Sequence, residues 1–149
     1  MTIEQVLAPE TVNTNLQGND KREIIEELLD ILIKAGNVSQ REQALEDLLK
    51  REEKMSTGIQ YGVAIPHAKT SAVDTLAACI GIHKKGIDFN ALDGGKSQIF
   101  VMTLSPLDRT GPHLQFLAEI SKILLSQSVR RKLLKTEKAE DVLAVFRGL

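Results

Sequence analysis

Apolar residues early in the chain recur at intervals of three and four positions, the spacing of one face of an α-helix. The series follows Asp20, which stands three residues before Glu23 as in a capping box. The pair Gly36-Asn37 then gives a helix-stop signal. We therefore expect a helix between Asp20 and Gly36, with an apolar face made of Ile24, Ile25, Leu28, Leu29, Ile31 and Leu32.

A second helix is predicted directly after the first. Ser39 and Glu42 repeat the capping pattern, and the helix should end near residues 51–53. Before the first helix, residues 11–16 (TVNTNL) alternate in polarity, which predicts one strand in the lead-in. The apolar face of the second helix is expected to be Ala44, Leu45, Leu48 and Leu49.

The middle of the chain changes to short apolar runs typical of buried strands. These runs cover residues 63–65, 76–82 and 99–104. Glycine and aspartate at residues 86–89 and 93–95 indicate turns between the last two strands.

Helical spacing returns after Ser105-Pro106. A long helix comes first, followed by a short one at 129–134 and a last one at 137–146, capped by Thr136. Helices, a central sheet and a helical last third predict a mixed α/β fold in one domain spanning 1–149. The expected apolar face of the long helix is Leu114, Leu117, Ile120, Ile123 and Leu124.

Composition narrows the function classes. The net charge is −1, tryptophan is absent, and there are one Tyr and four Phe, which argues against a nucleic-acid-binding surface. The uncharged run 55–68 is too short and too interrupted to span a bilayer, and the first residues lack a signal-peptide pattern. Cys79 is the only cysteine, which excludes an internal disulfide. We therefore expect a cytoplasmic protein without membrane insertion.

One histidine follows a proline at the end of an apolar run. Proline cannot donate to a strand ladder, so Pro66 should end the strand and leave His67 on a loop. Loops at strand ends commonly carry reactive groups in α/β folds. The alternative is a surface histidine in an ordinary turn. Small or hydroxyl-bearing residues surround it: Ser56, Thr57, Gly58, Gly62, Ala68 and Thr70.

Two further residues suggest anion chemistry. Pro112 is expected at the first helical position, which places His113 in the first turn. There a neutral imidazole could donate one N–H to a phosphoryl oxygen, because a helix N-terminus disfavours imidazolium. Arg51, at the end of the second helix, could pair with a phosphate through its guanidinium fork. The alternatives are a first-turn histidine without a partner and a solvated arginine.

These residues lie within longer matching segments. STGI at 56–59 and GVAIPH at 62–67 follow Arg51, and a pattern HLxxLAxIS begins at His113. Together they resemble the active-site signature of the enzyme IIA domains of the bacterial phosphoenolpyruvate-dependent sugar phosphotransferase system. The branch is the fructose/mannitol type, which includes the nitrogen-regulatory enzyme IIA. The resemblance covers nearly the whole chain and implies a mixed sheet with helices on both sides.

The resemblance also implies roles. His67 would accept a phosphoryl group from the phosphocarrier protein HPr or a paralogue, as a tele-phosphohistidine-type intermediate, and pass it to a cysteine of an enzyme IIB. From the residues alone, either ring nitrogen of His67 is a candidate for the atom that carries the phosphoryl group. His113 would be the second active-site histidine and Arg51 a phosphate-facing charge, with no metal or cofactor. Two functions stay open: a carrier in sugar uptake, and a regulatory module whose binding to a target protein depends on phosphorylation.

The sequence departs from the family pattern at Gln60-Tyr61, where a glycine followed by a small polar or acidic residue is usual. We expect these larger side chains to lie at the rim of the site and to affect partner choice.

Three other signals are interpreted as structural. Asp93-Gly94-Gly95-Lys96-Ser97 lacks the first glycine of a P-loop. His83 is expected to be a solvated strand-end residue rather than a zinc ligand, and Cys79 a small buried residue.

Overall fold

A computed structural model describes residues 3–148 of the chain. The first third holds a short helix, a 3-10 turn, a two-residue strand and two long helices. The middle is a sheet, and the last third is helical. In chain order the elements are α1 (Ile3–Val6), η1 (Pro9–Thr11), β1 (Val12–Asn13), α2 (Lys21–Lys34), α3 (Arg41–Lys54), β2 (Val63–Ala64), β3 (His67–Lys69), β4 (Ala77–Asp88), β5 (Lys96–Ser105), α4 (Thr110–Leu124), α5 (Gln127–Leu134) and α6 (Ala139–Phe146).

The sheet is mixed, as predicted. Its strand order is β1-β4-β5-β2, and β3 also pairs with β5. The long strands β4 and β5 are antiparallel, whereas β1 is parallel to β4, and β2 and β3 are parallel to β5. The segment from β2 to β3 therefore follows one edge of β5, with Val63 opposite Ile99 and His67 opposite Thr103.

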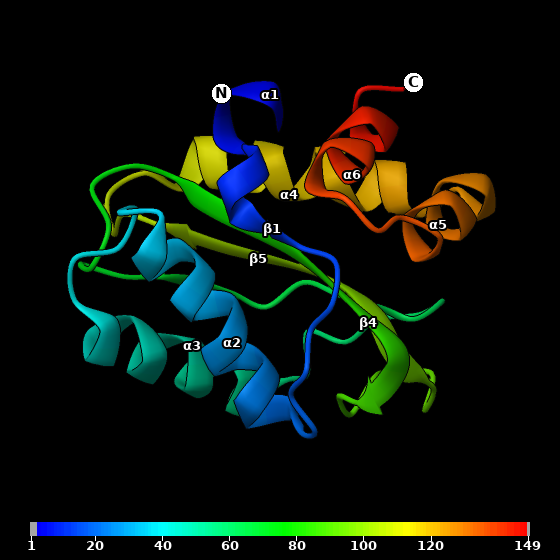
Figure 1. The fold of residues 1–149 in the computed structure, drawn as a ribbon. Helices are drawn as coiled ribbons and strands as arrows, with labels where there is room; N and C mark the ends of the chain where they lie inside the picture. The colour runs from blue at the N-terminus through cyan, green and yellow to red at the C-terminus, as the bar shows by residue number, and fades with distance from the viewer. Residues whose placement is uncertain (1–2, 149) are drawn as a thin grey trace.

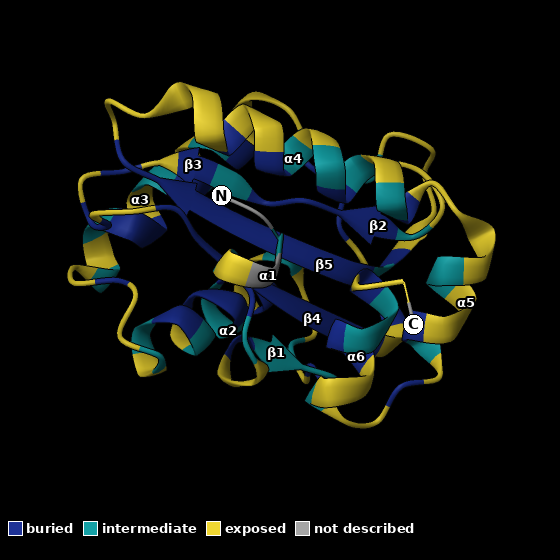
Figure 2. Ribbon diagram, turned by 90° about the horizontal axis from the view of Figure 1, so that it is seen from above, coloured by how far each residue is buried: buried dark blue, intermediate teal, exposed yellow. Residues whose placement is uncertain are grey.

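Helices cover both faces of this sheet (Figure 1). Side chains alternate between two faces along a strand, so each face has its own core. Phe100 and Met102 of β5 pack with α2 and α3 on one face, and Ile99 and Val101 pack with α4, α5 and α6 on the other. Figure 2 shows the central strands buried beneath helices whose outer faces are exposed. The prediction of an α/β fold with helices on both sides is confirmed.

The predicted start and stop of the first long helix are also confirmed. The carboxylate of Asp20 accepts a hydrogen bond from the backbone N–H of Glu23. At the other end, Gly36 adopts φ +83°, and the N–H of Asn37 reaches back to the carbonyl of Leu32. This left-handed residue and back-bond make the glycine-ended helix terminus that the sequence indicates.

Two other caps were predicted wrongly. Ser39 does not cap α3, because its side-chain hydroxyl and its N–H both donate to the carbonyl of Ala72. Thr136 does not cap α6, because its hydroxyl donates to the carbonyl of Leu133 at the end of α5. In both cases a hydroxyl suited to capping satisfies a carbonyl elsewhere, a competition that serine and threonine commonly enter.

The buried face of α4 is rotated relative to the prediction. Leu114 is 60% exposed, whereas Phe116 is fully buried and packs with Ile120 and Leu124. Pro112 is the third helical residue rather than the first, which is still within the turn whose N–H groups need no intrahelical partner.

The strand predictions were right in place and wrong in length. β4 continues to Asp88, because the glycine at 86 produces a bulge with φ +81° rather than a turn. β1 keeps only Val12–Asn13 of the predicted 11–16, and α1 was not predicted. The turn at 93–95 is present, with Gly94 at φ +75°. Among the described helices, none is long and apolar enough to cross a membrane.

Candidate active site

His67 is the first residue of β3 rather than a loop residue, which corrects the prediction from Pro66. The two short strands β2 and β3 both pair with β5, and Pro66 lies between them. The carbonyl of Pro66 accepts from the N–H of Thr103, so the proline stays joined to β5 although it has no N–H to donate. A half-buried histidine is thereby fixed on a strand at the edge of the sheet.

The backbone also orients the ring of His67. Its Nδ1 lies 2.8 Å from the carbonyl oxygen of Ile65. A carbonyl only accepts, so Nδ1 carries the hydrogen, and Nε2 carries the lone pair. The fold thus presents one ring nitrogen as a nucleophile.

Burial lowers the pKa of His67 below its usual value, and the Arg51 guanidinium lowers this pKa further. The bond to Ile65 and the carboxylate of Glu52 oppose this fall in the pKa. The net direction favours the neutral ring, which is the form with a free lone pair.

His113 lies in the first turn of α4, as predicted, and faces His67. The two ring centroids are 5.8 Å apart with the planes at 78°. His113 is only 4% exposed, and each of its ring nitrogens contacts a hydroxyl of β5, Thr103 at 2.9 Å and Ser105 at 2.8 Å. The histidine is therefore not a solvated first-turn residue.

Burial lowers the pKa of His113 to about 4, and the neighbouring His67 and Lys69 contribute to this lowered pKa. This lowered pKa favours the neutral ring.

Both histidines line a cavity of about 340 Å³ that Arg51 also lines, from the last turn of α3. The guanidinium donates to the carbonyl of Met55 at 2.9 Å, which leaves other N–H groups free for an anion. All three residues singled out in the sequence thus lie around one cavity.

Several groups of this cavity were missed from the sequence. Lys69 follows His67 by two residues on β3, so strand alternation turns both side chains to the same face, and its ammonium contacts the hydroxyl of Thr110. Lys50 and Lys54 lie on either side of Arg51 in the sequence and are four residues apart on α3, so they share one side of the helix. With Asp47 as the one carboxylate among its lining residues, the described cavity is positively charged and suited to a phosphoryl group.

The match to known proteins agrees with this geometry. Residues 5–148 match the family model described as "Phosphoenolpyruvate-dependent sugar phosphotransferase system, EIIA 2". The chain belongs to this EIIA family. It is therefore a phosphotransferase component of the kind that carries its phosphoryl group on a histidine.

Relatives include both transport and regulatory proteins. The fructose-specific EIIA component of Haloferax volcanii is 41% identical over 83% of this chain and 82% of its own length. The nitrogen regulatory protein of Bradyrhizobium diazoefficiens is 32% identical over 98% of this chain and 95% of its own length. The fructose-specific EIIABC component of Bacillus subtilis is 33% identical, and this chain spans only 23% of its length.

Solved structures share the fold. The nitrogen regulatory protein IIA-Ntr of Neisseria meningitidis superposes with a TM-score of 0.85 at 27% identity, covering 97% of this chain and 98% of the other. The IIA mannitol chain in a complex with phosphorylated IIB mannitol from Escherichia coli gives a TM-score of 0.82 at 20% identity, covering 96% and 98%.

The hydroxyls of the STGI segment in this EIIA chain bond to other parts of the fold, and Ser56 and Thr57 do not line the His67 cavity. Thr57 donates its N–H and its hydroxyl to the carboxylate of Glu52, and Ser56 donates to the carbonyl of Phe89. Thr70 is fully buried and accepts from the N–H of Ala72. The motif is a support for the site rather than a part of its lining.

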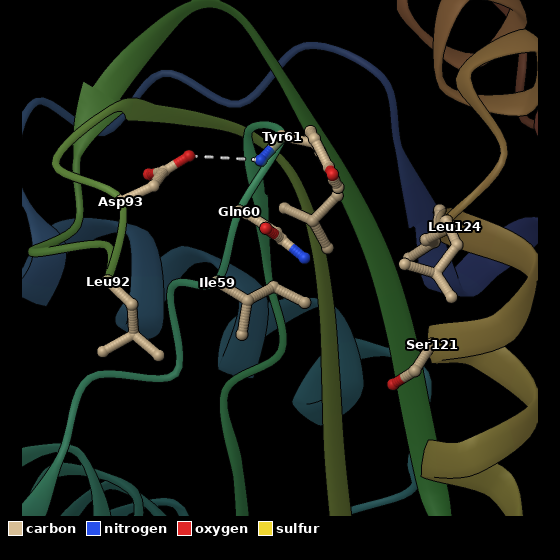
Figure 3. A pocket seen from close by; sticks show the side chains of 9 residues that line it. Ile59, Gln60, Tyr61, Leu92, Asp93, Ser121 and Leu124 are labelled. Carbon is tan, nitrogen blue, oxygen red and sulfur yellow. Dashed lines mark hydrogen bonds between the residues drawn. The ribbon is translucent and has the colours of Figure 1, made fainter.

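Gln60 and Tyr61 do not lie at the rim of the His67 cavity, which corrects the sequence-based expectation. They line a separate cavity of about 480 Å³ between the start of β2, the Leu92-Asp93 turn and the end of α4 (Figure 3). Tyr61 adopts φ 64°, its N–H donates to Asp93 at 3.3 Å, and the Arg130 guanidinium lies over its ring.

We therefore expect Tyr61→Asn to change the rate of phosphoryl acceptance by less than about two-fold. Asparagine tolerates the left-handed conformation, so the loss of the cation–π contact should alter the free energy of unfolding by only about 1 kcal/mol. Rapid-quench labelling and urea unfolding would measure the two effects. A ten-fold slower but folded variant would contradict this assignment.

The remaining sequence signals are structural, with one correction. Cys79 is fully buried and its thiol contacts the carbonyl of Leu28. His83 is not solvated but 8% exposed, bound to the carbonyl of Gly18 and the N–H of Gly86. Within residues 3–148, no group of three His, Cys, Asp or Glu side chains is placed to hold a metal ion.

Proposed function

We propose that Nε2 of His67 accepts a phosphoryl group from the phosphohistidine of HPr or a paralogue and passes it to a cysteine of an enzyme IIB during sugar uptake. The chain 1–149 would act as one EIIA unit. The observation that carries this proposal is the bond from Nδ1 of His67 to the carbonyl of Ile65, because it leaves Nε2 unprotonated in a positively charged cavity.

The transfer needs no cofactor. The Nε2 lone pair attacks phosphorus while the N–P bond of the donor breaks and its electron pair returns to the donor imidazole. In the second step a thiolate of the acceptor attacks, and the electron pair of the N–P bond returns to Nε2. Catalysis of this kind consists mostly of positioning and of donors aimed at the phosphoryl oxygens.

The cavity offers such donors on two sides. Arg51 approaches from α3, and Lys69 and Thr110 lie at the β3 and α4 side. His113 is the second imidazole, 5.8 Å from His67 between ring centroids. We assign Arg51 and Lys69 to the phosphoryl oxygens, and His113 to excluding water from the side of the nucleophile that it covers.

Related proteins support the partners and a sugar class. The relative with 41% identity is named a fructose-specific EIIA component. One solved structure of the same fold is a complex of IIA mannitol with phosphorylated IIB mannitol. By analogy we propose an enzyme IIB as acceptor and a fructose-type substrate for the system that this chain serves.

Intact-protein mass spectrometry tests the carrier function. The full chain is mixed with phosphoenolpyruvate, enzyme I and HPr, and an acid-labile gain of one phosphoryl mass, about 80 Da, is expected on His67. Subsequent addition of an enzyme IIB should remove it. A folded chain that gains no mass from an active donor pair would contradict the proposal.

A regulatory role is the second candidate. It is favoured by the nitrogen regulatory protein that matches 98% of this chain and by the IIA-Ntr structure. A phosphoryl group adds charge and acceptor oxygens, which is sufficient to switch protein docking. Phosphorylated chain that discharges to no enzyme IIB, but binds a target protein only in one phosphorylation state, would favour regulation over uptake.

The rate of phosphoryl acceptance should stay constant from about pH 8 down to the ordinary histidine pKa of 6.5 and fall only below it. The nucleophile is active when unprotonated, and burial together with Arg51 lowers the pKa of His67, so activity persists at lower pH. Single-turnover rates against pH give the midpoint.

Arg51→Gln serves as the matched variant, since both proteins use the same donor. Removal of the guanidinium should raise the pKa of His67 and shift the midpoint upward. A midpoint that moves downward would show that Arg51 does not act on His67.

A further inference from the structure

Two buried hydroxyl groups hold the ring of His113. Thr103 Oγ1 lies 2.9 Å from Nε2, and Ser105 Oγ lies 2.8 Å from Nδ1. Both side chains come from β5 and are almost wholly buried. Within the described part of the chain, neither hydroxyl has another hydrogen-bond partner. We call Thr103 and Ser105 the hydroxyl clamp.

The sheet register places the hydroxyl clamp directly beside the proposed acceptor. Thr103 is opposite His67 in the parallel pair of β3 and β5, and Ser105 is opposite Lys69. Paired residues point to the same face of a sheet, so all four side chains share the face that α4 covers. The ring of His113 lies over them.

Hydroxyl partners allow a histidine to change its protonation state. A neutral imidazole has one N–H and one lone pair, whereas imidazolium has two N–H groups. A hydroxyl can either donate or accept a hydrogen bond, whereas a carbonyl or a carboxylate only accepts and an ammonium only donates. The hydroxyl clamp therefore satisfies both nitrogens of His113 in either state, with only a rotation of O–H bonds.

The charges around His113 are positive in the unphosphorylated protein. His67 and Lys69 face it from β3, and α3 adds Arg51, so the surroundings favour the neutral ring. A phosphoryl group on His67 would introduce a charge of about −1.5 to −2 beside the same ring. The remaining titratable lining residues are Asp47, Lys50 and Lys54 of α3.

We propose that His113 takes up a proton when His67 is phosphorylated, and that Thr103 and Ser105 are the positioning residues that make this possible. One hydroxyl already accepts from the ring N–H, and the other turns from donating to the lone pair to accepting from the new N–H. This inference rests on the proposed function of His67. The proton comes from solvent, and it leaves again when the phosphoryl group passes to the acceptor. Transfer would thus be coupled to a proton that neutralises part of the phosphoryl charge.

Histidine ring ¹⁵N NMR tests the proposal on the full chain. A titration of the free protein between about pH 3 and 9 is compared with one between about pH 5 and 9 for protein kept phosphorylated by excess phosphoramidate. Phosphorylation should raise the midpoint of His113 by about one to three pH units, as for an ionisable group gaining an opposite charge nearby. An unchanged midpoint with His67 fully phosphorylated would overturn the proposal.

Variants separate the hydroxyl clamp from a general electrostatic effect. With Thr103→Val or Ser105→Ala, one N–H of the imidazolium loses its acceptor, so the midpoint of His113 in the phosphorylated protein should fall by about one unit or more. Thr103→Ser should restore it. The control is Ser97→Ala, because Ser97 is a fully buried hydroxyl of the same strand without a hydrogen-bond partner.

The use of phosphoramidate keeps this result separate from the carrier function. Labelling by phosphoramidate but not by HPr would contradict the proposed donor and still test the proton uptake. An unlowered midpoint of His113 in both phosphorylated clamp variants would show that the hydroxyls have no role and overturn the assignment. If His67 accepts from neither donor, the proposed function fails, and the inference fails with it.

Discussion

Replacement of His67 by alanine should reduce phosphoryl acceptance below detection in intact-protein mass spectrometry. The ring supplies the nucleophilic Nε2, and its Nδ1 is fixed by the carbonyl of Ile65. No other described histidine offers a comparable nitrogen, because both nitrogens of His113 and of His83 are hydrogen-bonded. The variant should stay folded, because His67 is only partly buried at the edge of the sheet.

His113→Gln is the informative companion. It removes the second imidazole without touching the acceptor, so labelling should still reach His67, at a rate lower by about 10²-fold. Circular dichroism and thermal unfolding confirm that each variant is native. Residual acid-labile phosphate in His67→Ala would show that the acceptor is a different residue. An unchanged rate in His113→Gln would show that His113 has only a structural role.

Features that depend only on residues close by in the sequence were predictable. The Asp20 cap, the Gly36 stop and the first-turn position of His113 follow from local rules about φ angles and free N–H groups. The apolar runs of the central strands likewise indicated a sheet buried on both faces. Such features depend on neighbours within a few positions, which the sequence displays directly.

Contacts between distant segments were not predictable in this way. The hydroxyls of Thr103 and Ser105 meet His113 only because β5 and α4 pack in one register. Nothing in either segment alone indicates that register. Ser39 was assigned to a cap for the same reason, since the carbonyl of Ala72 that it satisfies belongs to a distant segment. Thr136 is a local error, because its hydroxyl donates to the nearby carbonyl of Leu133 instead of capping the next helix.

Gln60 and Tyr61 show the opposite error, in which closeness in sequence was mistaken for closeness in space. Strand residues advance about 3.3 Å each, so the six steps from Tyr61 to His67 separate the two residues by up to about 20 Å. The two positions therefore lie at different ends of the β2–β3 edge and line different cavities.

Glu52→Ala should lower the free energy of unfolding by about 3 kcal/mol, because it removes one partner of a buried ion pair. Its carboxylate is 5% exposed, pairs with the ammonium of Lys21 at 2.7 Å, and accepts both the N–H and the hydroxyl of Thr57. Removal leaves one partly buried cation and two donors without their partner, and each loss costs free energy.

This bond set also ties the end of α3 to the STGI segment, and so joins Arg51 to the strand that carries His67. Urea unfolding should show a lower midpoint with an unchanged slope, and the melting temperature should fall by roughly 6–12 °C. Glu53→Ala is the matched control, since Glu53 is an exposed neighbour on the same helix and should change stability by less than about 0.5 kcal/mol. Equal stability of the two variants would mean that the attraction between Lys21 and Glu52 only offsets the free-energy cost of burying their charges. The support of the STGI segment would then have to come from Ser56, whose hydroxyl holds the carbonyl of Phe89 at 2.7 Å.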